Sequence, residues 1–299
     1  MPAAQAAPGA VTPSVVLLAI RPRTLTAAVA PVLVATAFAA GGGVARYGAA
    51  AACLLSALLI QVGTNLANDY YDFKKGADTD ARVGPKRVTQ AGLVAPATVK
   101  RWAFATFGAA AVVGVYLASL GGWPILLVGI ASIASGWAYT GGPYPLGYHG
   151  LGDLFVMVFF GFVATLGTYW VQAGALPPAL WLLAIPVGAL ATAILVVNNL
   201  RDRLTDAKAG KRTLAVRLGA GAAKAEYLLL LAAAFAVPLV LAAHGLRPWV
   251  LLPLAALPLA VPPLKLVLSL EGAALGPALG GTARLQLVFA ALLSLGLLF

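Results

Sequence analysis

The sequence predicts an all-α, polytopic membrane protein with about nine transmembrane helices. Of its 299 residues, 61% are hydrophobic and only 10% are charged, and the mean hydropathy is +0.93. Several stretches are long and almost free of charge, and a helix of about 20 apolar residues is enough to span a bilayer. A transmembrane β-barrel would instead show short segments of alternating hydrophobicity, which are missing from this sequence.

The first five apolar segments are separated by glycine, proline or charged residues, as helix boundaries should be. The tail over 1–20 has no basic region before its apolar stretch, unlike a cleaved signal peptide, and is expected to lie in the cytosol. The first segment ends in three glycines, the second ends at a group of acids, and a basic pair precedes the third. A single glycine separates the third from the fourth, and a loop rich in glycine, proline and tyrosine precedes the fifth. These segments are 22–42, 47–68, 102–120, 122–140 and 151–172.

The last four apolar segments follow the same pattern. Gly174 and Pro177 separate the fifth from the sixth, a charged loop follows the sixth, and an Arg-Pro pair precedes the eighth. Prolines inside segments, such as Pro186 and Pro238, are compatible with transmembrane helices whose neighbours satisfy the freed backbone groups. The four segments are 178–200, 222–243, 249–268 and 283–299. We expect all nine to form one membrane-embedded domain over 1–299.

Charge predicts the orientation of these segments in the membrane. Nine spans put the two termini on opposite sides, and a cytoplasmic N-terminus leaves only Arg46 and Arg247 of the 20 Lys and Arg residues outside. Because basic loops favour the cytoplasm, the C-terminus is expected outside. All nine acids also fall on the cytoplasmic side. Topology and contact with anionic membrane lipids therefore explain the net charge of +11, which does not indicate nucleic-acid binding.

Six of the nine acids lie in two groups at the ends of apolar segments, here named the first and second acidic motifs. The first motif, at 65–80, reads NLANDYYDFKKGADTD, and the second, at 198–206, reads NNLRDRLTD. Asn65, Asp69 and Asp72 follow one another at spacings of four and three, which place them on one face of a helix. In the second motif, spacings of four do the same for Asn198, Asp202 and Asp206. The Asn-x-x-x-Asp pattern recurs 133 positions later, from 65 to 198, which suggests an internal duplication.

The paired acids indicate a metal–diphosphate site. Charged residues at a membrane boundary are costly and mark function. Mg²⁺ binds one or two carboxylates together with substrate phosphates, and it polarises a diphosphate as a leaving group. Two acidic helix ends on the same side can hold two or more Mg²⁺ ions, for which Mn²⁺ can substitute. The acids expected in catalytic and metal-binding roles are Asp69, Asp72, Asp202 and Asp206, with Asp78 as a further metal ligand. For Asp80 and Glu226 we prefer the simpler interpretation of helix capping and local ion pairs.

Basic residues follow each acidic motif and are candidates for binding the diphosphate, because Arg binds phosphate bidentately and Lys as a point charge. They are Arg82, Lys86 and Arg87 after the first motif and Lys208, Lys211 and Arg212 after the second. Topology alone would also enrich these loops in basic residues.

At these residues the chain resembles the UbiA superfamily of intramembrane prenyltransferases. The similarity extends over most of the chain, and the two acidic motifs indicate the superfamily. Within it, the chain looks like the branch acting on 1,4-dihydroxy-2-naphthoate in menaquinone synthesis. The segments that point to this branch are 139–153 (YTGGPYPLGYHGLGD) and 209–219 (AGKRTLAVRLG). Shorter matches are 21–24 (RPRT), 82–87 (RVGPKR), 198–202 (NNLRD) and 281–285 (GTARL).

The resemblance implies an Mg²⁺-dependent enzyme of a bacterial cell membrane. It would transfer a polyprenyl group from polyprenyl diphosphate to 1,4-dihydroxy-2-naphthoate with loss of CO₂, giving demethylmenaquinone. The helices would surround a central, lipid-accessible cavity that opens to the cytoplasmic side, with cytoplasmic active-site loops at 69–101 and 201–221. Further residues expected to contact substrate or diphosphate are Asn65, Asn68, Tyr139, Asp153, Asn198 and Arg201.

One departure from the family pattern affects the first acidic motif. Many superfamily members have a further Asp four residues after the second acid, where this chain has Gly76, so the third acidic ligand is open. Alternative acceptors, such as 4-hydroxybenzoate or homogentisate, keep the same chemistry, although the LGYH sequence after Tyr139 differs from the basic pair of hydroxybenzoate enzymes. An ion-coupled transporter is the alternative from another class, but it would need acids at mid-membrane depth.

Overall fold

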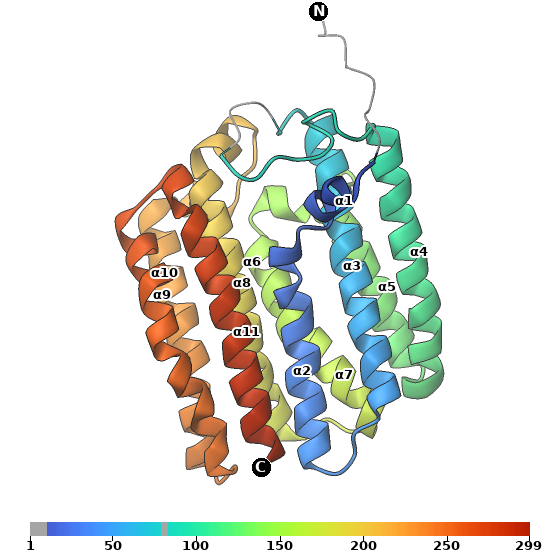
Figure 1. Cartoon of the computed structure of the whole chain (residues 1–299), viewed down its shortest axis with the longest axis vertical. Coiled ribbons are helices and arrows are strands. Elements are labelled where there is room, and N and C mark those ends of the chain that lie inside the picture. The colour runs from blue at the N-terminus through green and yellow to red at the C-terminus, as the bar shows by residue number, and fades with distance from the viewer. Residues whose placement is uncertain (1–10, 79–82) are drawn as a thin grey trace, which may run out of the picture.

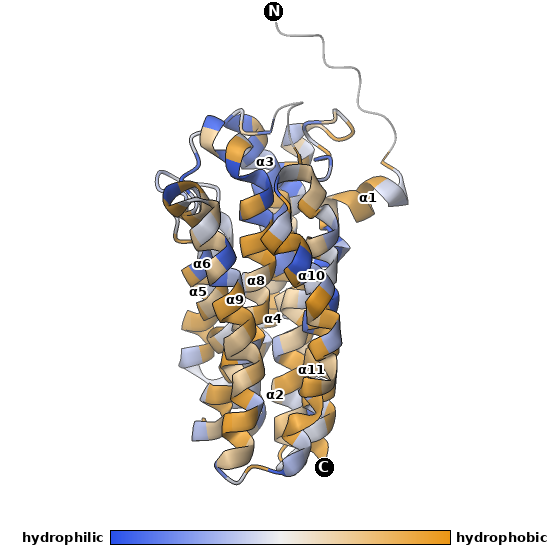
Figure 2. Cartoon of the chain, turned by 90° about the vertical axis from the view of Figure 1, so that its left-hand side faces the viewer, coloured by the Kyte–Doolittle hydropathy of each residue, from blue (hydrophilic) through white to orange (hydrophobic). Residues whose placement is uncertain are grey.

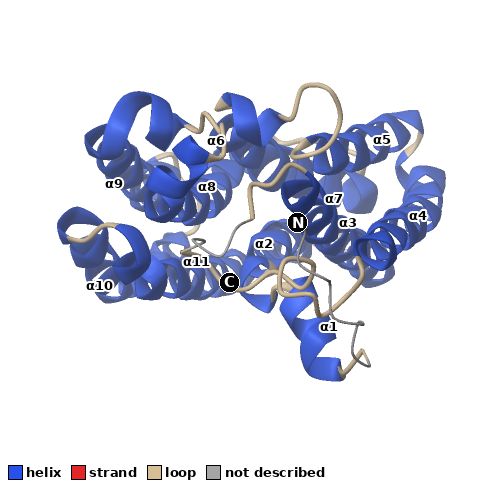
Figure 3. Cartoon of the chain, turned by 90° about the horizontal axis from the view of Figure 1, so that it is seen from above, coloured by secondary structure: helices blue, strands red, loops and turns tan. Residues whose placement is uncertain are grey.

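Eleven α-helices and several short 3₁₀ or π segments make up the secondary structure of the computed structural model, which describes residues 11–78 and 83–299. The helices run roughly side by side in one bundle (Figures 1 and 3). The α-helices are α1 (Pro13–Ile20), α2 (Thr26–Gly41), α3 (Tyr47–Lys74), α4 (Pro96–Gly121), α5 (Trp123–Ala138), α6 (Gly152–Val156), α7 (Ala164–Ala173), α8 (Pro178–Lys208), α9 (Leu214–Ala243), α10 (Leu257–Ser269) and α11 (Gly276–Leu298). The 3₁₀ segments are η1 (Pro22–Thr24), η2 (Leu146–His149), η4 (Pro248–Ala256) and η5 (Gly272–Leu275), and η3 (Met157–Val163) is a π-helix.

All nine predicted apolar segments fall on helices, and this confirms the all-α membrane class. Seven helices of the described chain are long and apolar enough to cross a membrane. The α1–η1 segment and α2 meet at 53° and form an eighth span if they are counted together. The remaining segment, α5, has 16 residues and is shorter than the others.

Five helices extend several residues further than the sequence predicted: α4, α9 and α11 begin earlier, at Pro96, Leu214 and Gly276, and α3 and α8 end later. The last two carry the acidic motifs. The loops expected from residues 69 and 201 begin only after Lys74 and Lys208, because no glycine or proline interrupts the polar ends of α3 and α8. Each helix stops next to a glycine in the left-handed conformation, Gly76 (φ +69°) and Gly210 (φ +77°). The acids therefore lie on rigid helical turns, which fixes their direction.

The cytosolic tail expected at 1–20 is partly helical, since α1 covers Pro13–Ile20. It turns into η1 at Arg21, which has φ +57° and is the one non-glycine residue with positive φ among the described residues.

The largest buried apolar cluster packs α8 against α2, α9, α11 and the η4–α10 segment. Helix α8 lies within the bundle, and most of its residues between Leu180 and Asp202 are buried. Hydrophilic residues concentrate at the end of the bundle where α3 and α8 terminate (Figure 2). Both acidic motifs therefore reach the same polar end.

Candidate active site

A cavity of about 860 Å³ runs through the bundle and changes in character along its length. It reaches from Asp72 to Cys53 on α3, 19 residues or about 28 Å of helix. At the polar end its walls include Lys86, Arg87 and Lys211, while the deeper part is lined by apolar residues that include Val32, Ile125, Val128, Phe160, Val163 and Val171. The cavity can therefore accept a long apolar molecule with a charged head.

Helix α3 contributes the first acidic motif to the polar end. Asn68 and Asp72 line the cavity, and Thr140 Oγ1 donates to Asn68 Oδ1 over 2.7 Å. Asp72 is 1% exposed and accepts three hydrogen bonds. The donors are Tyr148 Oη at 2.7 Å to Oδ1, and Arg87 Nη2 at 3.3 Å and Lys211 Nζ at 3.2 Å to Oδ2.

Helix α8 contributes the second acidic motif on the same cavity. Asn198, Asp202 and Asp206 all line it, as their spacing predicted. Arg201 donates to both oxygens of Asp202, from Nε at 2.8 Å and from Nη2 at 2.7 Å. The same Nη2 donates to Asn198 Oδ1 at 2.8 Å. Arg201 thus holds the side chains of the second motif in one arrangement.

Lys211 connects the two motifs. Its ammonium group lies 3.2 Å from Asp72 Oδ2 and 3.7 Å from Asp206 Oδ1. Burial, the largest single influence, lowers the pKa of Lys211, but the nearby Asp72 and Asp206 carboxylates outweigh it and the net pKa is raised. Lys211 therefore remains charged, and a cation is held between the two acidic helix ends.

Tyr148, in η2, packs against Lys75 and Lys211. Lys75 Nζ lies 4.6 Å and Lys211 Nζ 5.0 Å from the centroid of its ring, both within cation–π range. Burial, followed by the charge of Asp72, raises the pKa of the Tyr148 phenol, so the hydroxyl keeps its proton and donates to Asp72. Burial also lowers the pKa of Lys75, whose ammonium donates to the Thr140 carbonyl oxygen at 2.6 Å.

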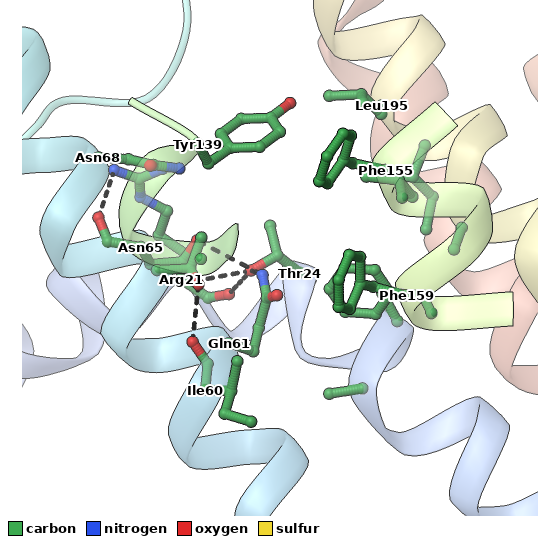
Figure 4. A pocket seen from close by; sticks show the side chains of 18 of the residues that line it. Arg21, Thr24, Ile60, Gln61, Asn65, Asn68, Tyr139, Phe155, Phe159 and Leu195 are labelled. Carbon is green, nitrogen blue, oxygen red and sulfur yellow. Dashed lines mark hydrogen bonds between the residues drawn. The ribbon is translucent and has the colours of Figure 1, made fainter. Parts of the chain in front are cut away.

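A slot lies deeper in the cavity, between a polar and an aromatic wall (Figure 4). On the polar side, Asn65 Nδ2 donates to Ile20 O at 2.8 Å and to Thr24 Oγ1 at 2.9 Å, and Gln61 Nε2 also donates to Thr24 Oγ1. Phe155 and Phe159 face this wall from the other side, with centroids 5.8 Å apart and rings nearly parallel. The slot can hold a flat molecule with polar substituents.

A matching family model and curated relatives agree on what the chain is. The model of the UbiA prenyltransferase family matches residues 28–271. The chain belongs to the UbiA prenyltransferase family. Among curated proteins, the 1,4-dihydroxy-2-naphthoate octaprenyltransferase of Mycobacterium tuberculosis is 43% identical over 241 residues, 81% of this chain and 82% of that protein. The enzyme of the same name from Bacillus subtilis is 35% identical over 284 residues, 93% of this chain and 90% of that protein.

Solved structures confirm the UbiA fold. A UbiA homolog from Aeropyrum pernix K1 has a TM-score of 0.67 at 16% identity, covering 96% of this chain and 98% of that one. A UbiA homolog from Archaeoglobus fulgidus, bound to GPP and Mg²⁺, has a TM-score of 0.66 at 16% identity, covering 95% and 99%.

Several residues expected in the site of this UbiA family member lie elsewhere. Asp69 and Asp78 are buried but are not among the described residues lining the cavity. Asp69 binds loop backbone, and Asp78 Oδ2 lies 3.5 Å from Arg87 Nε. Asp153 is buried behind the cavity, and neither of its oxygens has a hydrogen-bond partner in the described chain. Lys208 and Arg212 are exposed and do not line the cavity. The Arg212 backbone N–H donates to Tyr148 O. Arg82 lies outside the described residues.

The remaining expected residues line the cavity: Asn65, Asn68, Asp72, Lys86, Arg87, Tyr139, Asn198, Arg201, Asp202, Asp206 and Lys211. Sequence reasoning settled no role for Tyr148, and it missed Lys75, Gln61 and the two phenylalanines. Gln61 was recoverable, because it lies four residues before Asn65 on the same helical stripe.

The oxygen ligands at the polar end fit a hard divalent cation. In the described chain, no three His, Cys, Asp or Glu side chains form a metal cluster by themselves. Mg²⁺ does not need such a cluster, since it binds through one or two carboxylates together with water and substrate phosphates. The Lys211 ammonium between Asp72 and Asp206 marks a position where these carboxylates already hold a positive charge.

Proposed function

We propose that this protein transfers a polyprenyl group from polyprenyl diphosphate to 1,4-dihydroxy-2-naphthoate with loss of CO₂, giving demethylmenaquinone. The observation that supports this most strongly is the meeting of two acidic motifs at the polar end of a long apolar cavity. The curated relatives with the naphthoate activity support the acceptor, because they match the chain over most of its length.

The donor would bind with its diphosphate at the polar end and its prenyl chain in the apolar part of the cavity. Lys86, Arg87 and Lys211 supply positive charge there. Arg87 is 7% exposed, and its Nη1 has no hydrogen-bond partner in the described chain. A buried, unpaired guanidinium N–H is costly, and a diphosphate oxygen would satisfy it.

The divalent metal would be held by Asp72, Asp202 and Asp206, with the amide oxygens of Asn68 and Asn198 nearby. When bound, Mg²⁺ neutralises the diphosphate and stabilises the negative charge that it gains as a leaving group. Arg201 keeps Asp202 and Asn198 oriented toward the cavity by its hydrogen bonds.

The reaction would begin when the allylic carbon–oxygen bond breaks and its electron pair leaves with the diphosphate. The ring carbon bearing the carboxylate then forms a bond to the allylic cation. The bond to the carboxylate breaks next, and its electrons restore the aromatic ring as CO₂ leaves. No electrons are removed, so the first product is the reduced quinol form of demethylmenaquinone. Apolar walls exclude water that would otherwise quench the cation.

The acceptor would bind in the slot between the polar wall and Phe155 and Phe159. A naphthalene ring can stack on Phe159, while the hydroxyl groups face Thr24 and Gln61. This position lies just below Tyr139 and next to the diphosphate end, so the acceptor ring would meet the allylic carbon. Tyr139 would help to close the slot from above.

The membrane location follows from the apolar helices, and we further propose a bacterial inner membrane with the polar end of the cavity facing the cytoplasm. The N-terminus would lie in the cytoplasm and the C-terminus outside, as the distribution of basic residues favours. The whole chain would then act as one catalytic domain, with the active-site loops after α3 and α8 on the cytoplasmic side.

A competition between acceptors tests this proposal. Purified protein in lipid nanodiscs receives Mg²⁺, a polyprenyl diphosphate and equal amounts of 1,4-dihydroxy-2-naphthoate, 4-hydroxybenzoate and homogentisate. Mass spectrometry should find the prenylated, decarboxylated naphthalene product in large excess. Preferred prenylation of either other acceptor would keep the prenyltransferase and reject the naphthoate assignment, while no prenylated product would reject both.

A further inference from the structure

Asp69 lies in the middle of the first acidic motif but points away from the cavity. Its side chain is 1% exposed, and each carboxylate oxygen accepts one backbone N–H from the loop between α3 and α4. Val88 N donates to Oδ2 at 3.1 Å, and Thr89 N donates to Oδ1 at 3.2 Å. Asn68 and Asp72, one and three residues away on α3, line the cavity instead.

The two N–H groups belong to the segment that directly follows the basic residues of this loop. Val88 and Thr89 are buried, and the Val88 side chain packs in the same apolar cluster as Leu66 of α3. The preceding residues, Lys86 and Arg87, line the polar end of the cavity. The Asp69 carboxylate therefore fixes the backbone immediately next to Arg87.

Arg87 directly precedes this backbone and reaches the cavity from it. Its Nη2 lies 3.3 Å from Asp72 Oδ2 and its Nε lies 3.5 Å from Asp78 Oδ2. With both of these nitrogens turned toward carboxylates, the unpaired Nη1 is the donor left for an anionic ligand. A small shift of the loop would move this nitrogen by a similar amount.

We propose that Asp69 is a positioning residue that holds the loop backbone so that Arg87 binds the diphosphate, and that it is not a metal ligand. The proposal rests on the diphosphate-binding function proposed above. Charge-assisted hydrogen bonds from two adjacent N–H groups occupy both carboxylate oxygens and are stronger than neutral ones. Asp69 thus acts on the substrate through Arg87, whereas Asp72 acts at the cavity itself.

Separate measurements of metal and diphosphate binding test this division of roles. The variants are Asp69→Asn, whose amide nitrogen cannot accept one of the two N–H groups, and Asp72→Asn as the matched comparison. The probes are Mn²⁺ alone, followed by electron paramagnetic resonance, and inorganic diphosphate at saturating Mn²⁺, followed by calorimetry. Neither measurement needs prenyl transfer, so both remain informative if the proposed acceptor is wrong.

For Asp69→Asn we expect a Kd for Mn²⁺ within about twofold of wild type and a Kd for diphosphate raised roughly tenfold, as for one lost buried hydrogen bond. Hydrogen exchange at the amides of Val88 and Thr89 should accelerate while the rest of α3 stays protected. Asp72→Asn should raise the Kd for Mn²⁺ more than tenfold and leave the amides of Val88 and Thr89 protected from exchange. Equal loss of Mn²⁺ binding in both variants would make Asp69 a metal ligand and overturn the proposal, as would an unchanged diphosphate Kd in Asp69→Asn.

Two further variants keep the test decisive if Asp69→Asn is poorly folded. Thr89→Pro removes one N–H donor from the loop side and leaves the carboxylate intact, and it should raise the diphosphate Kd in the same way. In an Arg87→Met background, Asp69→Asn should raise the diphosphate Kd by less than about a further twofold, because both changes remove the same contact. Additive effects of Asp69→Asn and Arg87→Met would show that Asp69 acts independently of Arg87 and would contradict the proposal.

Discussion

Lys211 Nζ lies 3.2 Å from Asp72 Oδ2, although the two residues are 139 positions apart in the chain. Asp72 comes from the first acidic motif and Lys211 from the loop that follows the second, so this contact closes the site across the bundle. The same ammonium lies 3.7 Å from Asp206. Two motifs that are far apart in the sequence therefore meet at the polar end of the cavity.

Replacing Lys211 with Met should lower kcat/KM for the prenyl donor by roughly tenfold to a hundredfold. A hydrogen bond to a charged group contributes about 1.5–3 kcal/mol, and the loss would leave the buried Asp72 carboxylate with one partner fewer. The rate of prenyl transfer at several donor concentrations measures this effect. Lys208→Met is the matched control, because Lys208 is exposed at the end of α8 and should change kcat/KM less than twofold. Equal losses in both variants would show that net charge alone matters.

Asp72→Asn and Asp202→Asn should each reduce prenyl transfer by more than about a hundredfold while the proteins insert and fold normally. Each substitution keeps the shape of the side chain but removes a charge from the oxygen set that fits Mg²⁺. EDTA should abolish wild-type transfer, and added Mg²⁺ should restore it. Activity that survives EDTA, or near wild-type rates in both variants, would remove the metal from the mechanism.

Phe159→Ala should raise the KM for the aromatic acceptor by about tenfold and leave the KM for the prenyl donor unchanged. The ring lines the deeper slot, and aromatic pairs contribute about 0.5–1.5 kcal/mol beyond their buried area. Phe162→Ala provides the control, since Phe162 is outside the cavity lining and its ring centroid lies 6.3 Å from that of Trp181. A rise in the KM for the donor instead would place the prenyl chain, not the acceptor, against Phe159.

Gly161→Ala should destabilise the protein by about 1–3 kcal/mol and lower its activity. A Cβ at this position would lie 2.8 Å from Gly188 Cα and 3.1 Å from Ala184 O, both backbone atoms of α8 that cannot turn aside. The strain would shift the π-helix η3, which contains Phe159 and directly follows α6 with Phe155. Thermal unfolding in detergent measures the effect. Gly108→Ala on α4 meets nothing within 4 Å and should be neutral or slightly stabilising, so a similar loss there would exclude the close-contact explanation.

The sequence was sufficient to predict the helices because apolar length and breaks at Gly, Pro and charge are local properties. It was less reliable at the ends of α3 and α8, where the apolar runs stop but the helices continue through the acidic motifs. Helices continue through such residues when tertiary contacts satisfy them, as Arg87, Tyr148 and Lys211 do for Asp72. The π-helix η3 has no simple sequence signal, and the close approach of its Gly161 to Gly188 of α8 appears only in the folded chain.

Both acidic motifs reach one cavity, but the directions of neighbouring side chains were not all predictable. Gln61, Asn65, Asn68 and Asp72, with spacings of four, three and four, form one stripe on α3 that faces the cavity. Asp69 follows Asn68 by a single position and so points about 100° away from it, toward the loop. The spacing of four from Asn65 made Asp69 look like part of the stripe, and only the loop contacts of the folded chain distinguish the two acids.

The most direct test of the proposed function is the ratio of CO₂ released to product formed by purified wild-type protein. With carboxyl-labelled 1,4-dihydroxy-2-naphthoate, a polyprenyl diphosphate and Mg²⁺, labelled CO₂ and prenylated naphthoquinol should appear in a one-to-one ratio. Both should disappear in Asp72→Asn. Prenylated product that retains the label, or no product from wild-type protein at any tested prenyl chain length, would contradict the proposed reaction.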